Sequence, residues 1–157
     1  MPRLALVLLV LLAACGPPDR ARQAVIESAT VTRLPLDRPW DSPTRSDWPD
    51  VYVDVRTTER RLLAPYTRSV FRTDVRENVS GDLPITFGPR ADQDGRAGLR
   101  DSLWLDVSDS DNVGDDLMFT SGTFALRDYA RGQRAGTTQT IRFSDDDSEV
   151  SIVVRWE

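Results

Sequence analysis

The chain has 157 residues, of which 39% are hydrophobic and 29% are charged, and this composition indicates one soluble, folded domain. All 20 basic residues are arginine, 20 of the 25 acidic residues are aspartate, and histidine is absent. With no histidine or lysine and a single cysteine, the chain cannot supply a Ser-His-Asp or Cys-His catalytic set, a Schiff-base lysine, or a His- or Cys-rich zinc site. The formal net charge of −5 argues against a dedicated nucleic-acid binder.

The N-terminal segment reads as an export signal. Arg3 is followed by an apolar run of about ten residues and then by small residues, and this run is shorter than the roughly 17 residues that a membrane-spanning helix needs. Leu12-Ala13-Ala14-Cys15 resembles the lipobox of bacterial lipoproteins. The resemblance implies cleavage before Cys15 and attachment of diacylglycerol and an acyl chain such as palmitate to this residue. Two or three chains of this kind anchor a protein stably to a membrane.

The sequence therefore predicts a lipoprotein signal peptide over residues 1–14 and a lipidated tether over 15–24. The implied location is the bacterial cell envelope. Because Gly16 follows the cysteine, the resemblance favours the periplasmic side of the outer membrane in a cell with two membranes. The alternative is an ordinary secretory signal that leaves Cys15 as a free thiol.

From residue 25 onward, apolar residues recur with a period near two, which predicts an all-β domain over residues 25–157. In 51–55 and 103–107 the odd-numbered residues are all valine or leucine and share one strand face, so this face is expected to be buried. Trp104 and Trp156 lie in strands and are also expected in the core. The predicted strands are Val25–Leu34, Val51–Thr57, Thr67–Val75, Pro84–Phe87, Leu103–Ser108, Leu117–Leu126, Gln139–Phe143 and Val150–Trp156.

Two loops between these strands are rich in aspartate. The first contains Asp41, Asp47 and Asp50, and the second contains Asp109, Asp111, Asp115 and Asp116. Two carboxylates about 4 Å apart repel by roughly 4 kcal/mol at an effective dielectric near 20, so a convergent cluster favours a bound cation. Calcium suits such loops because it takes six to eight oxygen ligands and tolerates irregular geometry. The alternative is a solvated pair of loops whose aspartates form Asx turns.

The same loops carry a resemblance to a known family. Asp50-Val51-Tyr52-Val53 resembles the D-P-Y-V strand entry of C2 domains, Asn78–Phe87 resembles a turn of that family, and residues 105–117 resemble its third loop. The resemblance implies an eight-stranded antiparallel C2-like β-sandwich with calcium at one end. Its ligands would be Asp41, Asp50, Asp109, Asp111 and Asp116, with Asp47 an alternative to Asp41 and Asp115 an alternative to Asp116.

Arginines also recur along one predicted strand. Arg68, Arg72 and Arg76 share the parity of one strand face, and three more arginines lie on or near the neighbouring strand, namely Arg56, Arg60 and Arg61. The pattern predicts either a basic patch for anionic head groups or a salt-bridged face, because four acidic residues lie among these arginines: Asp54, Glu59, Asp74 and Glu77.

Taken together, these features predict a non-enzymatic, lipid-anchored envelope module. Its calcium loops would stabilise it or contact a protein or an anionic lipid. One alternative is an ion-free structural or carbohydrate-binding β-sandwich. Another is a carboxylate-based hydrolase, because paired aspartates can serve as acid and base.

Overall fold

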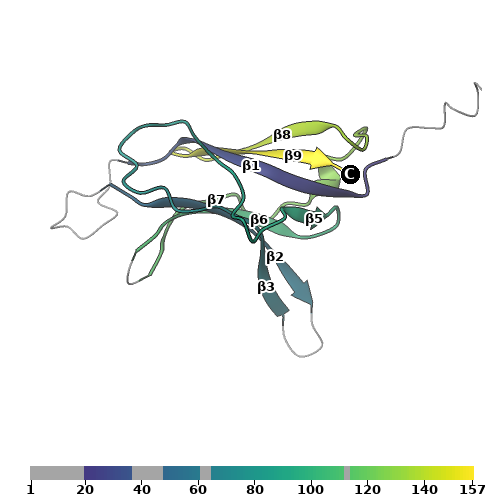
Figure 1. Ribbon diagram of the computed structural model, residues 1–157, viewed down its shortest axis with the longest axis horizontal. Coiled ribbons are helices and arrows are strands. Elements are labelled where there is room, and N and C mark those ends of the chain that lie inside the picture. The colour runs from purple at the N-terminus through teal and green to yellow at the C-terminus, as the bar shows by residue number, and fades with distance from the viewer. Residues whose placement is uncertain (1–19, 37–47, 61–64, 112–113) are drawn as a thin grey trace, which may run out of the picture.

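The computed structural model describes residues 20–36, 48–60, 65–111 and 114–157. Within these ranges two antiparallel sheets pack face to face (Figure 1). One sheet has the order β4-β1-β9-β8, with β5 also paired to β1, and the other has the order β3-β2-β6-β7. No helix in the described ranges is long and apolar enough to cross a membrane. The elements are β1 (Gln23–Arg33), β2 (Val51–Arg60), β3 (Pro65–Arg72), β4 (Ile85–Phe87), β5 (Arg96–Gly98), β6 (Leu103–Asp109), β7 (Asp116–Thr120), the 3₁₀ helix η1 (Leu126–Asp128), β8 (Thr138–Ser144) and β9 (Glu149–Trp156).

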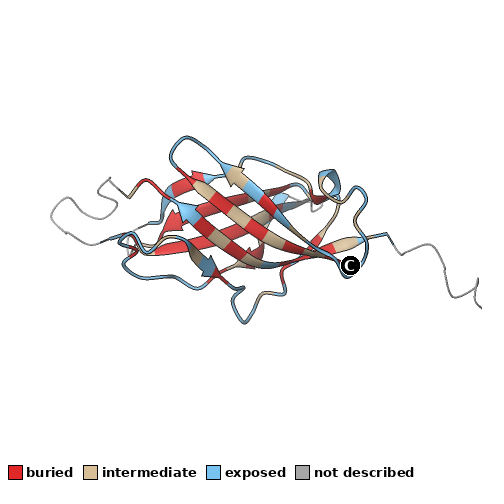
Figure 2. Cartoon of the chain, turned by 90° about the horizontal axis from the view of Figure 1, so that it is seen from above, coloured by how far each residue is buried: buried red, intermediate tan, exposed pale blue. Residues whose placement is uncertain are grey.

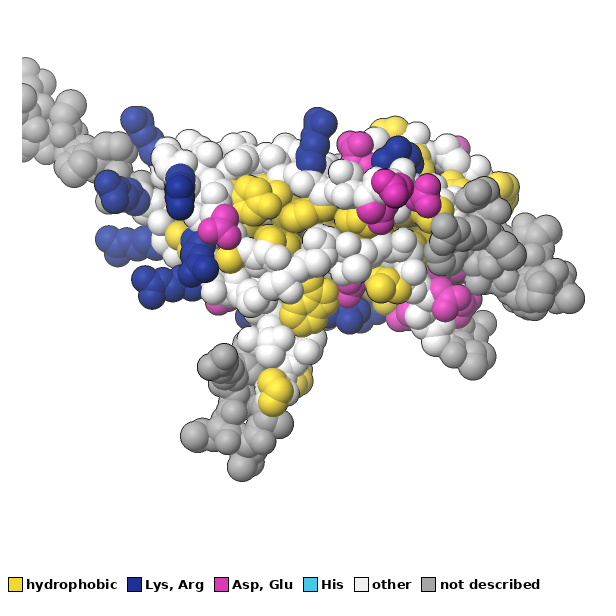
Figure 3. Space-filling model, turned by 180° about the vertical axis from the view of Figure 1, so that it is seen from behind, with side chains coloured by type: hydrophobic (Ala, Val, Ile, Leu, Met, Phe, Trp, Pro, Cys, Tyr) yellow, Lys and Arg dark blue, Asp and Glu magenta, His cyan; other side chains and the backbone are white. Residues whose placement is uncertain are grey.

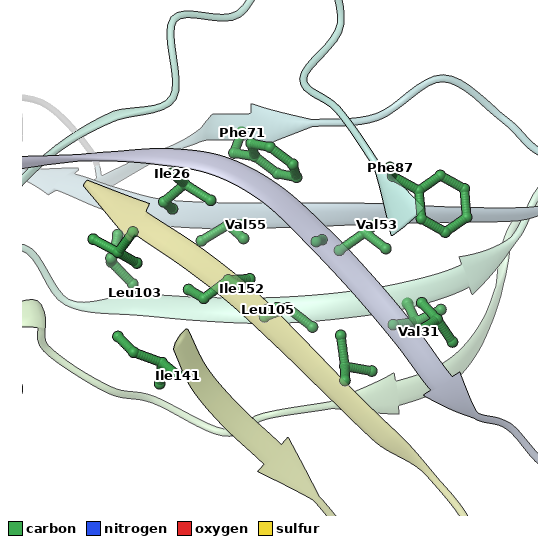
Figure 4. Close-up of a cluster of buried hydrophobic side chains, with 14 of the residues drawn as sticks. Ile26, Val31, Val53, Val55, Phe71, Phe87, Leu103, Leu105, Ile141 and Ile152 are labelled. Atoms are coloured by element: carbon green, nitrogen blue, oxygen red, sulfur yellow. The ribbon is translucent and has the colours of Figure 1, made fainter. Parts of the chain in front are cut away.

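The core confirms the predicted alternation. The odd-numbered residues of 51–55 in β2 and of 103–107 in β6 are buried and meet apolar side chains of β1 and β9, among them Ile26, Val31 and Ile152 (Figure 4). Along β9 buried and half-buried residues alternate without a break, and Figure 2 shows this as stripes on the strands. All side chains of the buried core that the structure describes lie between Ala24 and Trp156. Residues 20–157 therefore contain the whole of this described core.

Apart from shifts of up to three residues at strand ends, the strand list differs from the prediction in two places. The short strand β5 was not predicted, because three residues, Arg-Ala-Gly, are too few to show a period. The predicted strand Leu117–Leu126 ends at Thr120, after which Gly122 takes a positive φ of 66° and the chain passes into η1. Glycine adopts this left-handed conformation at no steric cost, so it ends the strand here.

A β-bulge separates the arginines that were expected to share one face. Asp54 lies opposite Arg72, but Thr57 lies opposite Arg68, because Val70 is an extra residue in β3 that has no partner in β2. Arg68 and Arg72 therefore lie on opposite faces of the sheet, and the prediction of one continuous arginine stripe is wrong. Strict alternation fails wherever one strand carries such an insertion.

Gly95 allows the loop before β5 to approach β1 closely. Its carbonyl accepts a hydrogen bond from the Ile26 N–H (2.9 Å), and a Cβ at this position would lie 2.3 Å from the Ile26 carbonyl oxygen. The φ of Gly95 is 67°, almost equal to that of Gly122, where a Cβ would meet nothing within 4 Å. The two glycines form a matched pair in which only the steric contact differs.

We expect Gly122→Ala to lower the free energy of unfolding by about 1–2 kcal/mol, the cost of placing a side chain in the left-handed region. Gly95→Ala should cost at least about 2 kcal/mol more, because the new methyl group must also displace the backbone of β1. Urea denaturation of residues 20–157 measures both. Equal losses in the two variants would contradict the close packing of Gly95 on Ile26.

Candidate functional site

The ends of the two acidic loops lie side by side, because β2 and β6 pair in register. Val51, the first residue of β2, lies opposite Asp109, the last residue of β6. Two hydrogen bonds extend this pairing into the loops: the Asp50 N–H donates to Asp109 Oδ1 (2.7 Å), and the Ser110 N–H donates to the Asp50 carbonyl (2.8 Å). Two of the predicted calcium ligands, Asp50 and Asp109, are thus brought into direct contact.

A third segment, which contains Asn78 and Val79, is hydrogen-bonded to the residues just before β2. The Asn78 N–H donates to Asp50 Oδ1 (2.8 Å), and the Val79 N–H donates to the Pro49 carbonyl (2.9 Å). Asn78 has a positive φ of 54°, a conformation that asparagine tolerates better than most residues. The carboxylates of Asp50 and Asp109 therefore already accept backbone hydrogen bonds that hold three loop segments together.

The remaining predicted ligands of the second loop follow Asp109 at the same end of the sandwich. Asp111 is half-buried, and the exposed Asp116 lies in register with Asp109 on the neighbouring strand. The carboxylate of Asp115 accepts a hydrogen bond from the Tyr52 hydroxyl (2.7 Å). Of the two alternatives, Asp116 is thus the one that lies beside Asp109.

Three of the predicted residues, Asp41, its alternative Asp47 and the predicted lipidation site Cys15, lie outside the described residues. Within the described ranges, no three acidic or cysteine side chains lie close enough to hold a metal ion. Calcium takes six to eight oxygen ligands. A calcium site at this end would therefore depend on the first loop in addition to the second.

A second group of polar side chains lies on the outer face of the β3-β2-β6-β7 sheet. Asp54 and Asp106 lie directly opposite each other on β2 and β6, and Asp54 is only 1% exposed. Arg56 Nε contacts Asp54 Oδ2 at 2.8 Å, and Arg56 Nη1 lies 3.7 Å from Asp106 Oδ2. The indole of Trp104 donates to the same Asp106 oxygen (3.2 Å). Arg56 thus compensates two like charges that would otherwise face each other across the ladder.

Trp104 was expected in the core from its place in a strand, and this expectation is wrong. Trp104 occupies an even-numbered position of β6, lies opposite Arg56 and is half-buried on the outer face. The prediction of a salt-bridged face holds for Asp54 and Arg56. The opposition of Asp54 and Asp106 was missed, although both occupy the fourth position of the two alternating segments; only the pairing register shows that they meet.

Burial and charge act in opposite directions on Arg56. Burial disfavours its charged form, but the hydrogen bond to Asp54 and the nearby carboxylate of Asp106 outweigh this and raise the pKa of Arg56 above its usual value. Burial raises the pKa of the Tyr52 hydroxyl, and its hydrogen bond to Asp115 raises that pKa further. The Arg72 guanidinium lies 4.7 Å from the centre of the Tyr52 ring. The outer face is therefore held by charge pairs and ring contacts and links β3 to the second acidic loop.

We expect Arg56→Met to lower the free energy of unfolding by about 2–3 kcal/mol, because it leaves Asp54 and Asp106 facing each other uncompensated. Arg142→Met serves as the control, since Arg142 is exposed on β8 and forms no ion pair with a described carboxylate. Thermal and urea denaturation at neutral pH measure both variants. A loss no larger than that of the control would show that Arg56 does not compensate the two carboxylates.

No protein-family model and no curated protein sequence matches the chain. Solved structures do match its fold. A structure described as a C2 domain is 17% identical with a TM-score of 0.49, and the match covers 87% of this chain and 98% of that chain. A C2 domain of plant extended synaptotagmin 1 is 12% identical with a TM-score of 0.41, over 90% of this chain and 97% of that chain.

The human group IVD cytosolic phospholipase A2 matches with a TM-score of 0.51 and 14% identity. This match covers 89% of this chain but 18% of the enzyme, so it concerns one β-sandwich and not the enzyme as a whole. Sequence identities of 12–17% show a similarity of fold alone.

Proposed function

We propose that this chain, which has the C2-like β-sandwich fold, is a non-enzymatic binding module that is held at a membrane by lipid on Cys15. Its acidic loop end would bind calcium through Asp41, Asp50, Asp109, Asp111 and Asp116. The ion would stiffen the loops or mediate contact with an envelope protein or an anionic lipid.

The observation that carries this proposal is the contact between Asp50 and Asp109. These residues come from two loops far apart in the sequence, and the ladder of β2 and β6 holds them together at one end of the sandwich. Asp111 and Asp116 follow from the second loop at the same end. A cation between the loops would offset the repulsion that this concentration of carboxylates creates.

A second candidate, an ion-free structural or carbohydrate-binding sandwich, is favoured by a different observation. Asp50 Oδ1 and Asp109 Oδ1 accept backbone hydrogen bonds, and Asp145 does the same in the turn between β8 and β9, where its Oδ1 accepts from the Asp147 and Ser148 N–H groups. Aspartates used in this way fix loops without a metal. Calcium titration separates the two candidates.

We expect residues 20–157 to melt at a higher temperature in calcium than in EDTA or in magnesium at matched ionic strength. For a dissociation constant of about 10⁻⁴ M, about 1 mM free calcium stabilises the folded state by roughly 1.4 kcal/mol, or about 3–6 °C for a domain of this size. Differential scanning calorimetry measures the shift. The same melting temperature in all three buffers would favour the ion-free sandwich.

The matched variants are Asp109→Asn with Asp111→Asn at the loops, and Asp92→Asn with Asp128→Asn elsewhere. Both pairs change the net charge equally, and Asp92 and Asp128 are exposed residues whose arginine partners lie 3.3 and 3.8 Å away. Asparagine keeps an oxygen that can accept the Asp50 hydrogen bond, so the loop pair should fold but lose the calcium response. A calcium response that survives in the loop pair would place the ion elsewhere.

Lipid attachment makes a separate prediction. In a bacterial host, the mature chain should begin at Cys15, carry the mass of the acyl chains, and partition with membranes. Cys15→Ser should lose both the lipid and the membrane partition, because the anchor depends on the cysteine sulfur. Intact-mass spectrometry and fractionation measure this. An unmodified thiol in the soluble fraction of the wild type would refute the anchor.

A further inference from the structure

An arginine-lined hollow lies at the opposite end of the sandwich from the acidic loops. Its volume is about 650 Å³, and its rim carries Arg20, Arg127, Arg131 and Arg134. The lining also includes Ala21, Leu99 and Ala130, which contribute apolar surface between the charged groups. All four arginines are exposed. The hollow thus combines a positive rim with an apolar lining.

Little negative charge offsets this rim. Arg127 lies 3.8 Å from Asp128 in an exposed pair, and in the described part of the chain no carboxylate forms an ion pair with Arg20, Arg131 or Arg134. Among the residues that the structure describes, no acidic side chain lines the hollow. On the face that Figure 3 shows, arginines are concentrated at the end where the described chain begins and most acidic side chains at the other end, although each end also carries some charge of the opposite sign. We call the arginine-rich end the positive pole.

The backbone ties this positive pole to the start of the fold. Arg20 pairs with Arg134 in an isolated antiparallel bridge, so the first described residue lies on the rim itself. Four residues, 16–19, lie between Cys15 and Arg20, so the two are five residue steps apart. Even a fully extended chain of this length spans no more than about 18 Å. A lipid on Cys15 would hold the arginine rim close to the membrane surface.

We propose that the arginine rim is the surface that faces the anchoring membrane, where it binds the phosphates of anionic lipid head groups. Arginine suits this ligand because its planar guanidinium donates two parallel hydrogen bonds to phosphate oxygens. The acidic loop end then points away from the membrane, toward whatever partner the loops contact. This orientation rests on the proposed anchor at Cys15, but the affinity of the rim for anionic lipid can be measured without it.

The test uses residues 20–157, which lack the proposed anchor and contain the whole of the described core. Co-sedimentation with vesicles of phosphatidylcholine alone and of phosphatidylcholine with phosphatidylglycerol is measured in EDTA, so that calcium plays no part, at low ionic strength, where screening is weak. We expect binding to the anionic vesicles only. Arg131→Gln with Arg134→Gln should weaken it about twenty-five-fold, at roughly fivefold for each arginine near an anionic surface.

The control pair is Arg76→Gln with Arg142→Gln, which removes the same charge from exposed arginines outside the rim and should weaken binding far less. Equal weakening by the two pairs, or equal binding to neutral and anionic vesicles, would overturn the proposal. Binding that appears only with calcium and is lost in Asp109→Asn with Asp111→Asn would place the lipid at the loop end, which supports the calcium module and overturns this orientation. Failure of lipid labelling at Cys15 would refute the anchor and leave the affinity of the rim unchanged.

Discussion

The unbroken register between β2 and β6 is the constraint on which the rest of the structure depends. Seven consecutive residue pairs, from Val51 opposite Asp109 to Thr57 opposite Leu103, run without a bulge. Because side chains alternate along both strands, this register sends the valines and leucines into the core and places Asp54 opposite Asp106 on the outer face. It also ends with Asp109 beside Asp50. A shift of one residue would exchange core and surface and separate the two acidic loops.

The period-two alternation of apolar residues made the core predictable. It did not predict which residues of neighbouring strands lie opposite each other. The alternation in 51–55 and 103–107 gave the buried faces and, with the resemblance to C2 domains, the sandwich. It failed at Val70, where one extra residue turns Arg68 away from Arg72, and at β5, which is too short to have a period. Asp50 and Asp109 were predicted to lie close together and do so. Asp54 and Asp106 were missed, since each looks like an ordinary exposed strand residue until its partner is known.

The aspartates of this protein serve two physical roles that a sequence does not separate. Asp145 and Asp50 accept backbone N–H groups and shape loops, and such bonds need no ion. Asp54 is a different case, because it is buried in a sheet and its charge is offset by Arg56. A chain that uses aspartate and arginine almost exclusively as its charged residues relies on short carboxylates and long guanidinium groups. The short side chains fix local geometry, and the long ones reach across strands.

The pairing of the first and last strands bears on how the molecule carries mechanical load. β1 and β9 are antiparallel neighbours, and the Arg22 and Gln23 N–H groups both donate to the Glu157 carbonyl, so the beginning and the end of the fold are joined. A pull between the N-terminus and the acidic loop end runs along β1. The ladder bonds lie perpendicular to that direction and are strained together in shear, rather than broken one after another as in unzipping. A sandwich tethered at its first strand and engaged at its far end would thus resist tension with the full length of its longest strand.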